Sequence, residues 1–499
     1  MGRVQAIESR ALQSRMTPEL IRTLLIRRDS RRWARHTVEH SRPRDEQQRV
    51  STALLPGDGA RLARLWVAEI FTPLDFPNIS KQLDVLSGRS REMGAFRDYA
   101  EEFRKARRAS IAGWITLPSF KRRGSRYFNP NAMVEKLPPG VEHVGFRLTM
   151  VTPSVAAIVA ELTYSEDFSR RFGRLANRHY QTWAESRPGG GFVLHGVERQ
   201  KERAAFEWRS QRVAEASGLL AKHFPGFFAR EEGVNHPAVE LILTAGFLPW
   251  NYMAPNRGSR YRALGLDGVL GPQWVCGRAT ALRAKLADIP TDRMWGSVDT
   301  LVFAAREDEI DSDPPLGFRL RPNQHDFEAL GFLGDTVEPF ALRWALYRLV
   351  VRSGERFNGL RDGIALRVSK ATSKDFLRLR DDLLRLGVEN GHAIGEIVEY
   401  ANSDRDWNFE LQDFSGSFPP GYPPSATIDS LGEFVKLNLL READRLVRTE
   451  GEFRDLMSTS AEMTNAAFNA RLQGKFYILA ILSLVVALVA LYVSYLSLK

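Results

Sequence analysis

An uncharged apolar run near the C-terminus constrains this chain more than any other feature. It extends from Phe476 to Leu498, 23 residues without a charge, Pro or Gly. As a helix rising about 1.5 Å per residue it is about 34 Å long, enough for a hydrocarbon core of about 30 Å. A soluble helix of this length keeps a charged or strongly polar face, which this run lacks. The run therefore predicts one C-terminal transmembrane helix.

The charges that flank this run predict an orientation. Arg471 and Lys475 precede it, and only Lys499 follows. The positive-inside tendency then places residues 1–475 in the cytoplasm, with the span in the cell (inner) membrane. The single cysteine, Cys276, excludes an intramolecular disulfide and fits a reducing compartment. We interpret Cys276 as part of a strand or a short buried segment rather than as a nucleophile.

The basic charge is concentrated at the N-terminus. Residues 1–127 hold 26 Lys or Arg against 14 Asp or Glu, whereas the whole chain carries only +10. The runs Ile26–His36 and Phe120–Phe128 are rich in arginine and interleaved with aromatic residues. Three partners remain open for this region: solvent alone, anionic lipid of the inner leaflet, or nucleic acid.

The pattern along the chain predicts a mainly α protein with a mixed α/β middle region. Composition is ordinary for globular domains, with 43% hydrophobic and 26% charged residues. The predicted parts are a basic helical region (1–127), a mixed α/β region (128–308), a linker or long loop (309–326), an α-rich region (327–414), a Pro-rich spacer (415–430), a helical stalk (431–475) and a transmembrane helix (476–498).

Local patterns predict individual elements inside these parts. Thr17 followed by Pro18 is a helix start. Thr152 and Pro153 give the same signal. The expected helices are Pro18–Arg28, Gly57–Phe71, Gly94–Trp114, Thr152–Leu162 and Glu198–Phe224; the expected strands are His143–Val151 and Val298–Ala305.

Small residues recur along one face of the predicted span. A stripe of small side chains with a seven-residue repeat permits close approach of helices in lipid, so we expect self-association through this face. The stripe consists of Ala480, Ser483, Ala487, Ala490, Ser494 and Ser497. In the same register the stalk, an imperfect coiled coil, places polar residues at Glu452, Asp455, Glu462 and Asn469. These residues either line a water-filled path in an oligomer or face solvent.

A long cytoplasmic helix that enters a C-terminal span resembles the stalk of CorA-type cation transporters. The resemblance covers only about 70 residues, and this sequence lacks the family's Gly-Met-Asn signature and second span. It implies an architecture, not a shared activity.

One motif has the spacing of a metal site. His36, Glu39 and His40 match H-x-x-E-H, in which two histidines one turn apart bind zinc and the glutamate acts as a base. Five arginines between Arg31 and Arg44 would oppose a dication, so we interpret the motif as an exposed helix end. We expect no cofactor.

The sequence therefore leaves three functions open. The first is a non-enzymatic membrane-anchored protein whose cytoplasmic head senses a signal, acts as a scaffold or binds an unidentified protein partner. The second is an oligomeric ion-conducting or membrane-permeabilising protein gated by the head. The third is a membrane-tethered enzyme with a site that no motif reveals.

Overall fold

The computed structural model describes residues 18–54, 57–92, 97–109, 113–125, 132–187, 192–231, 235–248, 250, 261, 263–266, 273–277, 282–287, 300–312, 325–367, 391–417 and 429–497. The chain divides into two compact units. One comprises Met1–Leu349 with Gly395–Leu440, and the other Val350–Ile394 with Arg441–Lys499. The sheet and the candidate site both belong to the first unit.

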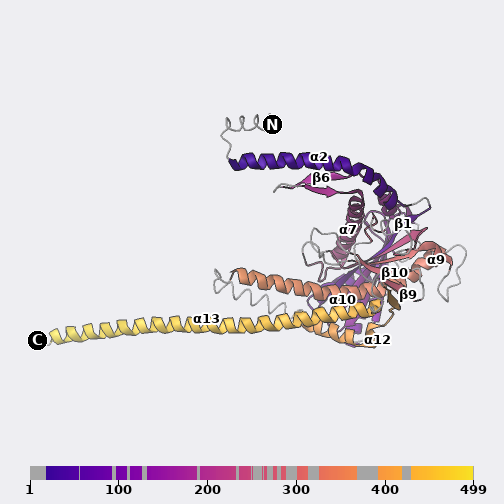
Figure 1. Cartoon of the computed structure of the whole chain (residues 1–499). Helices are drawn as coiled ribbons and strands as arrows, with labels where there is room; N and C mark the ends of the chain where they lie inside the picture. The colour runs from indigo at the N-terminus through magenta and orange to yellow at the C-terminus, as the bar shows by residue number, and fades with distance from the viewer. Residues whose placement is uncertain are drawn as a thin grey trace. The chain divides into compact units, whose positions relative to one another are not determined.

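A ten-stranded sheet organises the first unit (Figure 1). Its order is β12-β9-β10-β11-β8-β1-β5-β4-β2-β3. The pairs β8–β11 and β2–β3 are parallel, and the other neighbours are antiparallel. The strands are β1 (Gly59–Phe71), β2 (Gly113–Lys121), β3 (Met133–Val134), β4 (Val141–Thr152), β5 (Val155–Tyr164), β8 (Ala238–Ala245), β9 (Gln273–Cys276), β10 (Leu282–Ala287), β11 (Thr300–Arg306) and β12 (Phe414–Ser417).

Helices and one hairpin complete the described structure. The hairpin pairs β6 (Trp183–Ser186) with β7 (Phe192–His195). The helices are α2 (Pro18–Thr52), α3 (Phe76–Glu92), α4 (Tyr99–Ala109), α5 (Glu166–Ser169), α6 (Arg171–Ala176), α7 (Val197–His223), α9 (Glu307–Ser312), α10 (His325–Arg367), α12 (Asp404–Trp407) and α13 (Leu431–Ser497). Residues 391–402 are also helical.

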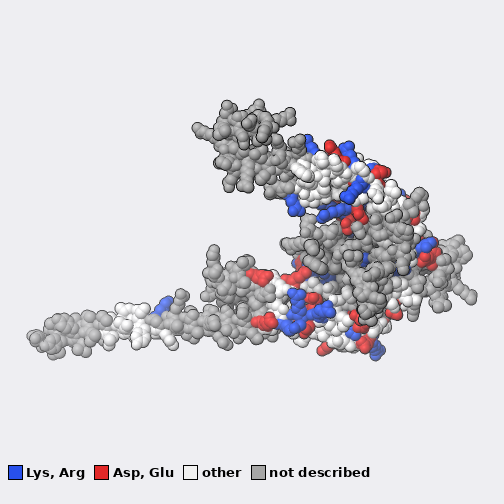
Figure 2. Space-filling view, in the orientation of Figure 1, with Lys and Arg blue, Asp and Glu red and all other residues white. Residues whose placement is uncertain are grey.

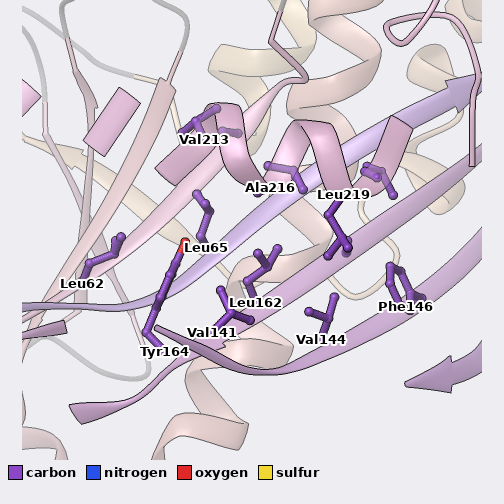
Figure 3. Close-up of a cluster of buried hydrophobic side chains, with 14 of the residues drawn as sticks. Leu62, Leu65, Val141, Val144, Phe146, Leu162, Tyr164, Val213, Ala216 and Leu219 are labelled. Carbon is purple, nitrogen blue, oxygen red and sulfur yellow. The ribbon is translucent and has the colours of Figure 1, made fainter. Parts of the chain in front are cut away.

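One face of the sheet forms the hydrophobic core. Alternate residues of β1, β4 and β5 point to this face and pack against α7, as the close-up shows (Figure 3). Leu65 and Leu162 come from the strands, and Val213, Ala216 and Leu219 come from the helix. Helices α3, α4 and α6 contribute further apolar residues to the same cluster. Burial of these side chains is the main stabilising term of the unit.

The opposite face is covered by α10 and changes character along the sheet. At β11 it is apolar, where the rings of Phe303, Phe340 and Phe414 lie with centroids 5.2–5.6 Å apart. Toward β1, β5 and β4 the same face carries charged residues, among them Arg64, Glu161 and Arg147. Polar residues on a covered face need partners, and this requirement positions the candidate site.

The predicted fold class is wrong about the first quarter of the chain and about residues 152–162. Gly57–Phe71 was expected to be helical but contains the central strand β1, and Thr152–Leu162 contains most of β5. Pro153 and Ser154 form the two-residue turn between β4 and β5 rather than a helix start. The helix starting at Pro18, the helix α7 and the strands β4 and β11 are confirmed.

The transmembrane helix in the predicted fold class is also corrected. Among the described residues, no helix combines the length and the apolar character that crossing a bilayer requires. The apolar residues lie in α13, where Phe476 to Leu484 and Val486 are exposed and no side chain after Val486 is described. Within these residues a coiled coil is not supported either.

Candidate functional site

A cavity of 320 Å³ lies where α10 crosses the end of β2 and β4. This volume is at the lower end of the range for small-molecule sites. Its walls come from segments far apart in the sequence. The lining residues are Gly113, Trp114, Arg147, Thr149, Met150, Val159, Glu338, Pro339, Leu342, Arg343, Tyr400, Arg405, Asp406, Phe409 and Glu410.

Strand alternation brings the polar groups of β2 and β4 to this cavity. Phe146, Leu148 and Met150 point into the core, so Arg147 and Thr149 point to the opposite face. Trp114 lies opposite Thr149 in the ladder and shares that face. Its side chain is 48% exposed, which is unusual for a residue that contributes to a cavity wall. An exposed aromatic ring beside a cavity is available for a ligand.

Two arginine–glutamate pairs cross this face of the sheet. Arg64 on β1 pairs with Glu161 on β5. Arg147 on β4 lies next to Glu338 on α10, with 3.3 Å between Nε and Oε1. It also donates to Glu410 Oε2, at 3.5 Å from Nη1. The guanidinium carbon of Arg147 lies 4.3 Å from the centre of the Trp114 ring, a cation–π distance.

A glycine on α10 makes room for the first of these pairs. A Cβ atom at Gly334 would lie 2.6 Å from Nη1 of Arg64, closer than a side chain permits. The helix can therefore approach the sheet at Gly334 while the arginine stays paired. One turn later the same helix face presents Glu338 to Arg147. Gly334 thus leaves room for the Arg64 guanidinium beneath α10.

Glu338 is the carboxyl whose surroundings differ most from water. Its side chain is 14% exposed, and its Oε1 accepts no hydrogen bond from the described residues. Burial raises the pKa of Glu338 to about 7; Arg147 opposes the rise, and the carboxylates of Glu161, Asp335 and Glu410 add to it. Burial also raises the pKa of Glu161 and of Asp335. The cavity therefore holds a carboxyl that changes charge near neutral pH.

Arg343 organises the opposite wall. This buried guanidinium donates to the carbonyl oxygens of Pro339, Trp407 and Phe409, at 3.1, 2.8 and 2.8 Å. These bonds hold the loop after α12 against α10. The loop ends in Glu410, whose φ of 61° lies in the left-handed region that side chains other than glycine rarely adopt. Strained backbone at such a position recurs at functional sites, because the surrounding contacts enforce it.

A second buried carboxylate, Glu69 on β1, has a different role. It accepts hydrogen bonds from the backbone N–H groups of Phe228 and Ala229, at 2.8 and 2.9 Å, and lies 2.8 Å from Nε2 of His236. Both side chains are buried, and neither lines the cavity described above. Glu69 therefore fastens the segment after α7 to the sheet, which is a structural function.

The predicted zinc motif lies on α2 as an exposed helix surface. The His36 and His40 rings stack with centroids 4.1 Å apart, and Nδ1 of His40 lies 3.0 Å from the carbonyl oxygen of His36. Glu39 is exposed beside them. Over the described residues, no group of three or more His, Cys, Asp or Glu side chains is placed to hold a metal ion. Cys276 is buried on β9.

The other predicted site residues all lie on α13. Ala480, Ser483 and Glu452 are exposed. The side chains of the remaining ones are outside the described set, so the packing face and the polar path stay predictions. These residues are Asp455, Glu462, Asn469, Ala487, Ala490, Ser494 and Ser497.

Many basic residues of the N-terminal region have partners within the chain. Arg61 pairs with Glu307, Arg89 lies 3.4 Å from Glu135, and Arg122 donates to the carbonyl oxygen of Val141 at 2.9 Å. Figure 2 shows basic and acidic side chains interspersed over the visible described surface. Part of the excess positive charge is thus engaged in contacts within the protein. Binding of anionic lipid or nucleic acid by this region stays a prediction.

Comparison with known proteins gave no match to a protein-family model, a curated protein or a solved structure. The interpretation of the cavity therefore rests on its own geometry. Sequence reasoning missed its residues, and the only local signal was a charge among apolar neighbours, Arg147 between Phe146 and Leu148 in β4.

Proposed function

We propose that the protein is a ligand-binding, sensing protein whose cavity receives a small organic cation, a protonated amine or a guanidinium with an apolar body. The observation that carries this proposal is Glu338. Its buried Oε1 lies 3.3 Å from Nε of Arg147 but accepts no well-formed hydrogen bond from the described residues, in a cavity with aromatic walls. An N–H group of a cation would supply the missing donor as a charge-assisted hydrogen bond.

Two of the three arginines that line the cavity, Arg147 and Arg343, favour a cation over an anion, whereas the third, Arg405, is exposed. Arg147 is occupied by Glu338, Glu410 and the Trp114 ring. Arg343 is occupied by backbone carbonyl groups. An anion would have to displace these contacts, whereas a cation uses an acceptor that is already present. The charges of Glu161 and Asp335 also act on Glu338 and raise its pKa, so they add to the negative potential at its carboxyl group.

The aromatic residues suit the apolar part of such a ligand. Trp114 and Phe409 are 48% and 57% exposed, and both line the cavity. Tyr400 is the third aromatic residue of the lining. Aromatic faces attract cations at about 0.5–2 kcal/mol each and bury apolar surface as well. A carboxylate with aromatic walls is thus a chemically consistent receptor for an aryl- or alkylammonium ion.

Calorimetric titration of the full-length chain tests this proposal with three probes of similar shape. Benzylammonium, benzyl alcohol and benzoate differ in charge but share the ring. At pH 8.5, where Glu338 is ionised, we expect benzylammonium to bind at least tenfold more tightly than the alcohol, a difference of about 1.4 kcal/mol, and benzoate to bind least. Glu338→Gln should abolish this preference.

The matched control is Glu355→Gln, which removes an exposed carboxylate of the same helix outside the cavity. It should leave the preference unchanged. Equal affinities for the three probes, or a preference that survives Glu338→Gln, would overturn the proposal.

A further inference from the structure

The cavity opens at an unpaired edge of the sheet. On one side β2 pairs with β4 from Gly113 to Lys121, and on the other side β3 pairs only with Phe120 and Lys121. No described strand lies beyond Gly113–Leu117 on that second side. Strand residues alternately direct their N–H and C=O groups toward each neighbour, so half of this stretch presents backbone groups outward. Such an edge is a template for an added strand.

This edge and the cavity are continuous. Gly113 and Trp114 belong to both. The exposed side chains of Trp114 and Thr116 lie on the same face as Arg147 and Thr149, the face that carries the cavity. A strand added beside β2 would lie about 4.8 Å away. Its residue opposite Trp114 would then have its Cβ about 5 Å from that of Trp114, at the mouth of the cavity.

We infer that the cation recognised by this cavity is the side chain of a lysine or arginine in an extended peptide segment, which pairs with the β2 edge as an additional strand. The inference rests on the proposed function. Backbone hydrogen bonds along Gly113–Leu117 would hold the segment, and the cavity would select the side chain, which is the usual division of roles in β-augmentation. The lining holds three carboxylates, Glu338, Asp406 and Glu410, beside three arginines, of which Arg147 and Arg343 are engaged in contacts within the chain; the carboxylates would pair with the basic side chain.

The periodicity of a strand makes the ligand specific. Every second side chain of the added segment points to the cavity face, and the others point to the opposite face of the sheet. We therefore expect a requirement for one basic residue, with apolar or β-branched residues around it, and not for a run of basic residues. If the ligand instead required a run of basic residues, that would indicate binding by charge alone.

Titration of the full-length chain with short blocked peptides tests the inference. The parent peptide is acetyl-Val-Thr-Val-Lys-Val-Thr-Val-amide. One variant carries norleucine in place of lysine, and two others carry N-methyl groups on alternate residues in the two possible phases. We expect the parent to bind at least tenfold more tightly than benzylammonium. Norleucine, and one N-methyl phase only, should each weaken binding at least tenfold. Amide exchange of Gly113–Leu117 should slow on peptide binding and not on benzylammonium binding.

A substitution on the β2 edge tests peptide binding separately from cation binding in the cavity. Thr116→Lys places a positive charge on the edge but outside the cavity lining. It should weaken peptide binding at least tenfold and change benzylammonium affinity less than twofold, with Thr116→Ser as the matched control. If benzylammonium binds but the parent peptide binds no more tightly and leaves amide exchange unchanged, the peptide inference is wrong and the cation site stands. If neither binds, the proposed function itself fails.

Discussion

Glu338 illustrates how burial and an ion pair compete at one residue. Arg147 lies 3.3 Å away and favours the ionised carboxylate. Removal from water and the nearby carboxylates favour the protonated form, and the pKa settles at about 7. Burial therefore outweighs the ion pair, as expected where a charged group loses most of its hydration. Glu338 thus has an ion-pair partner in Arg147, but its Oε1 accepts no well-formed hydrogen bond from the described residues.

This raised pKa predicts how stability depends on pH. The unfolded chain releases the Glu338 proton near its ordinary pKa of 4.5, whereas the folded chain keeps it up to about 7. Between these values the folded state binds more protons, so stability falls as pH rises through this window, by about 3 kcal/mol at most. Glu338→Gln should remove that contribution. Urea-unfolding midpoints at pH 5 and pH 8.5 measure it.

Glu355→Gln is the control for this measurement, because Glu355 is exposed. It should keep the pH dependence of the unchanged protein. An identical dependence in the Glu338→Gln variant would show that Glu338 titrates at its ordinary pKa.

At the residue scale, the sequence predicts how candidate site residues are spaced but not what surrounds them in the folded protein. His36 and His40 do lie on one helix face, as their separation of four residues requires. Whether such a pair binds metal depends on a third ligand from elsewhere, which spacing does not reveal. Glu338 was overlooked for the converse reason. On a helix that carries several charged residues, one more carboxylate reads as part of a solvated face, and only the sheet beneath α10 makes Glu338 unusual.

At the scale of elements, the central strands were the hardest to predict. β1 is buried along nearly its whole length, and β5 is similar, because core helices cover one face and α10 crosses the other. Such strands lose the alternation that marks a half-buried strand: β5 reads as a nearly continuous apolar run, and in β1 the apolar residues are interrupted by Arg61, Arg64 and Glu69. The alanines of β5, and the Thr-Pro pair before it, then favoured a helix. β4 keeps its alternation because Arg147 and Thr149 interrupt it, and it was predicted correctly.

The packing of α6 on β1 gives a prediction at this scale. A Cβ atom at Gly173 would lie 2.5 Å from the carbonyl oxygen of Ala60, a backbone atom near the start of β1. Gly173→Ala should therefore force α6 away from β1 and destabilise the protein by about 2–3 kcal/mol, as overpacking of a core does. The urea-unfolding midpoint should fall accordingly.

Gly218 on α7 is the matched position. A Cβ atom there meets nothing within 4 Å, and the residue is exposed in the middle of the helix. Gly218→Ala should leave stability unchanged or raise it by up to about 1 kcal/mol, through helix propensity alone. Equal effects of the two substitutions would contradict the close approach of α6 to β1.

At the scale of the whole molecule, the sequence could not reveal the site. Its walls combine β2, β4, α10 and the loop after α12, so that Trp114, Arg147, Glu338 and Glu410 meet only through the sheet order. No local repeating pattern of residues in the sequence encodes the order of the strands. The globular composition and several amphipathic helices were predictable, because they depend on neighbours within a few turns. The transmembrane prediction counted all 23 apolar residues of one run, whereas the described residues contain no helix fit to cross a bilayer.

The most direct test of the account is the proton balance of ligand binding. Benzylammonium should be titrated into the full-length chain at pH 7 in two buffers that differ in ionisation enthalpy. Because Glu338 is about half protonated at that pH and a bound cation favours its ionised form, we predict release of about half a proton per ligand. The Glu338→Gln variant should release none. Binding without proton release, or equal release by the variant, would contradict a cation site centred on Glu338.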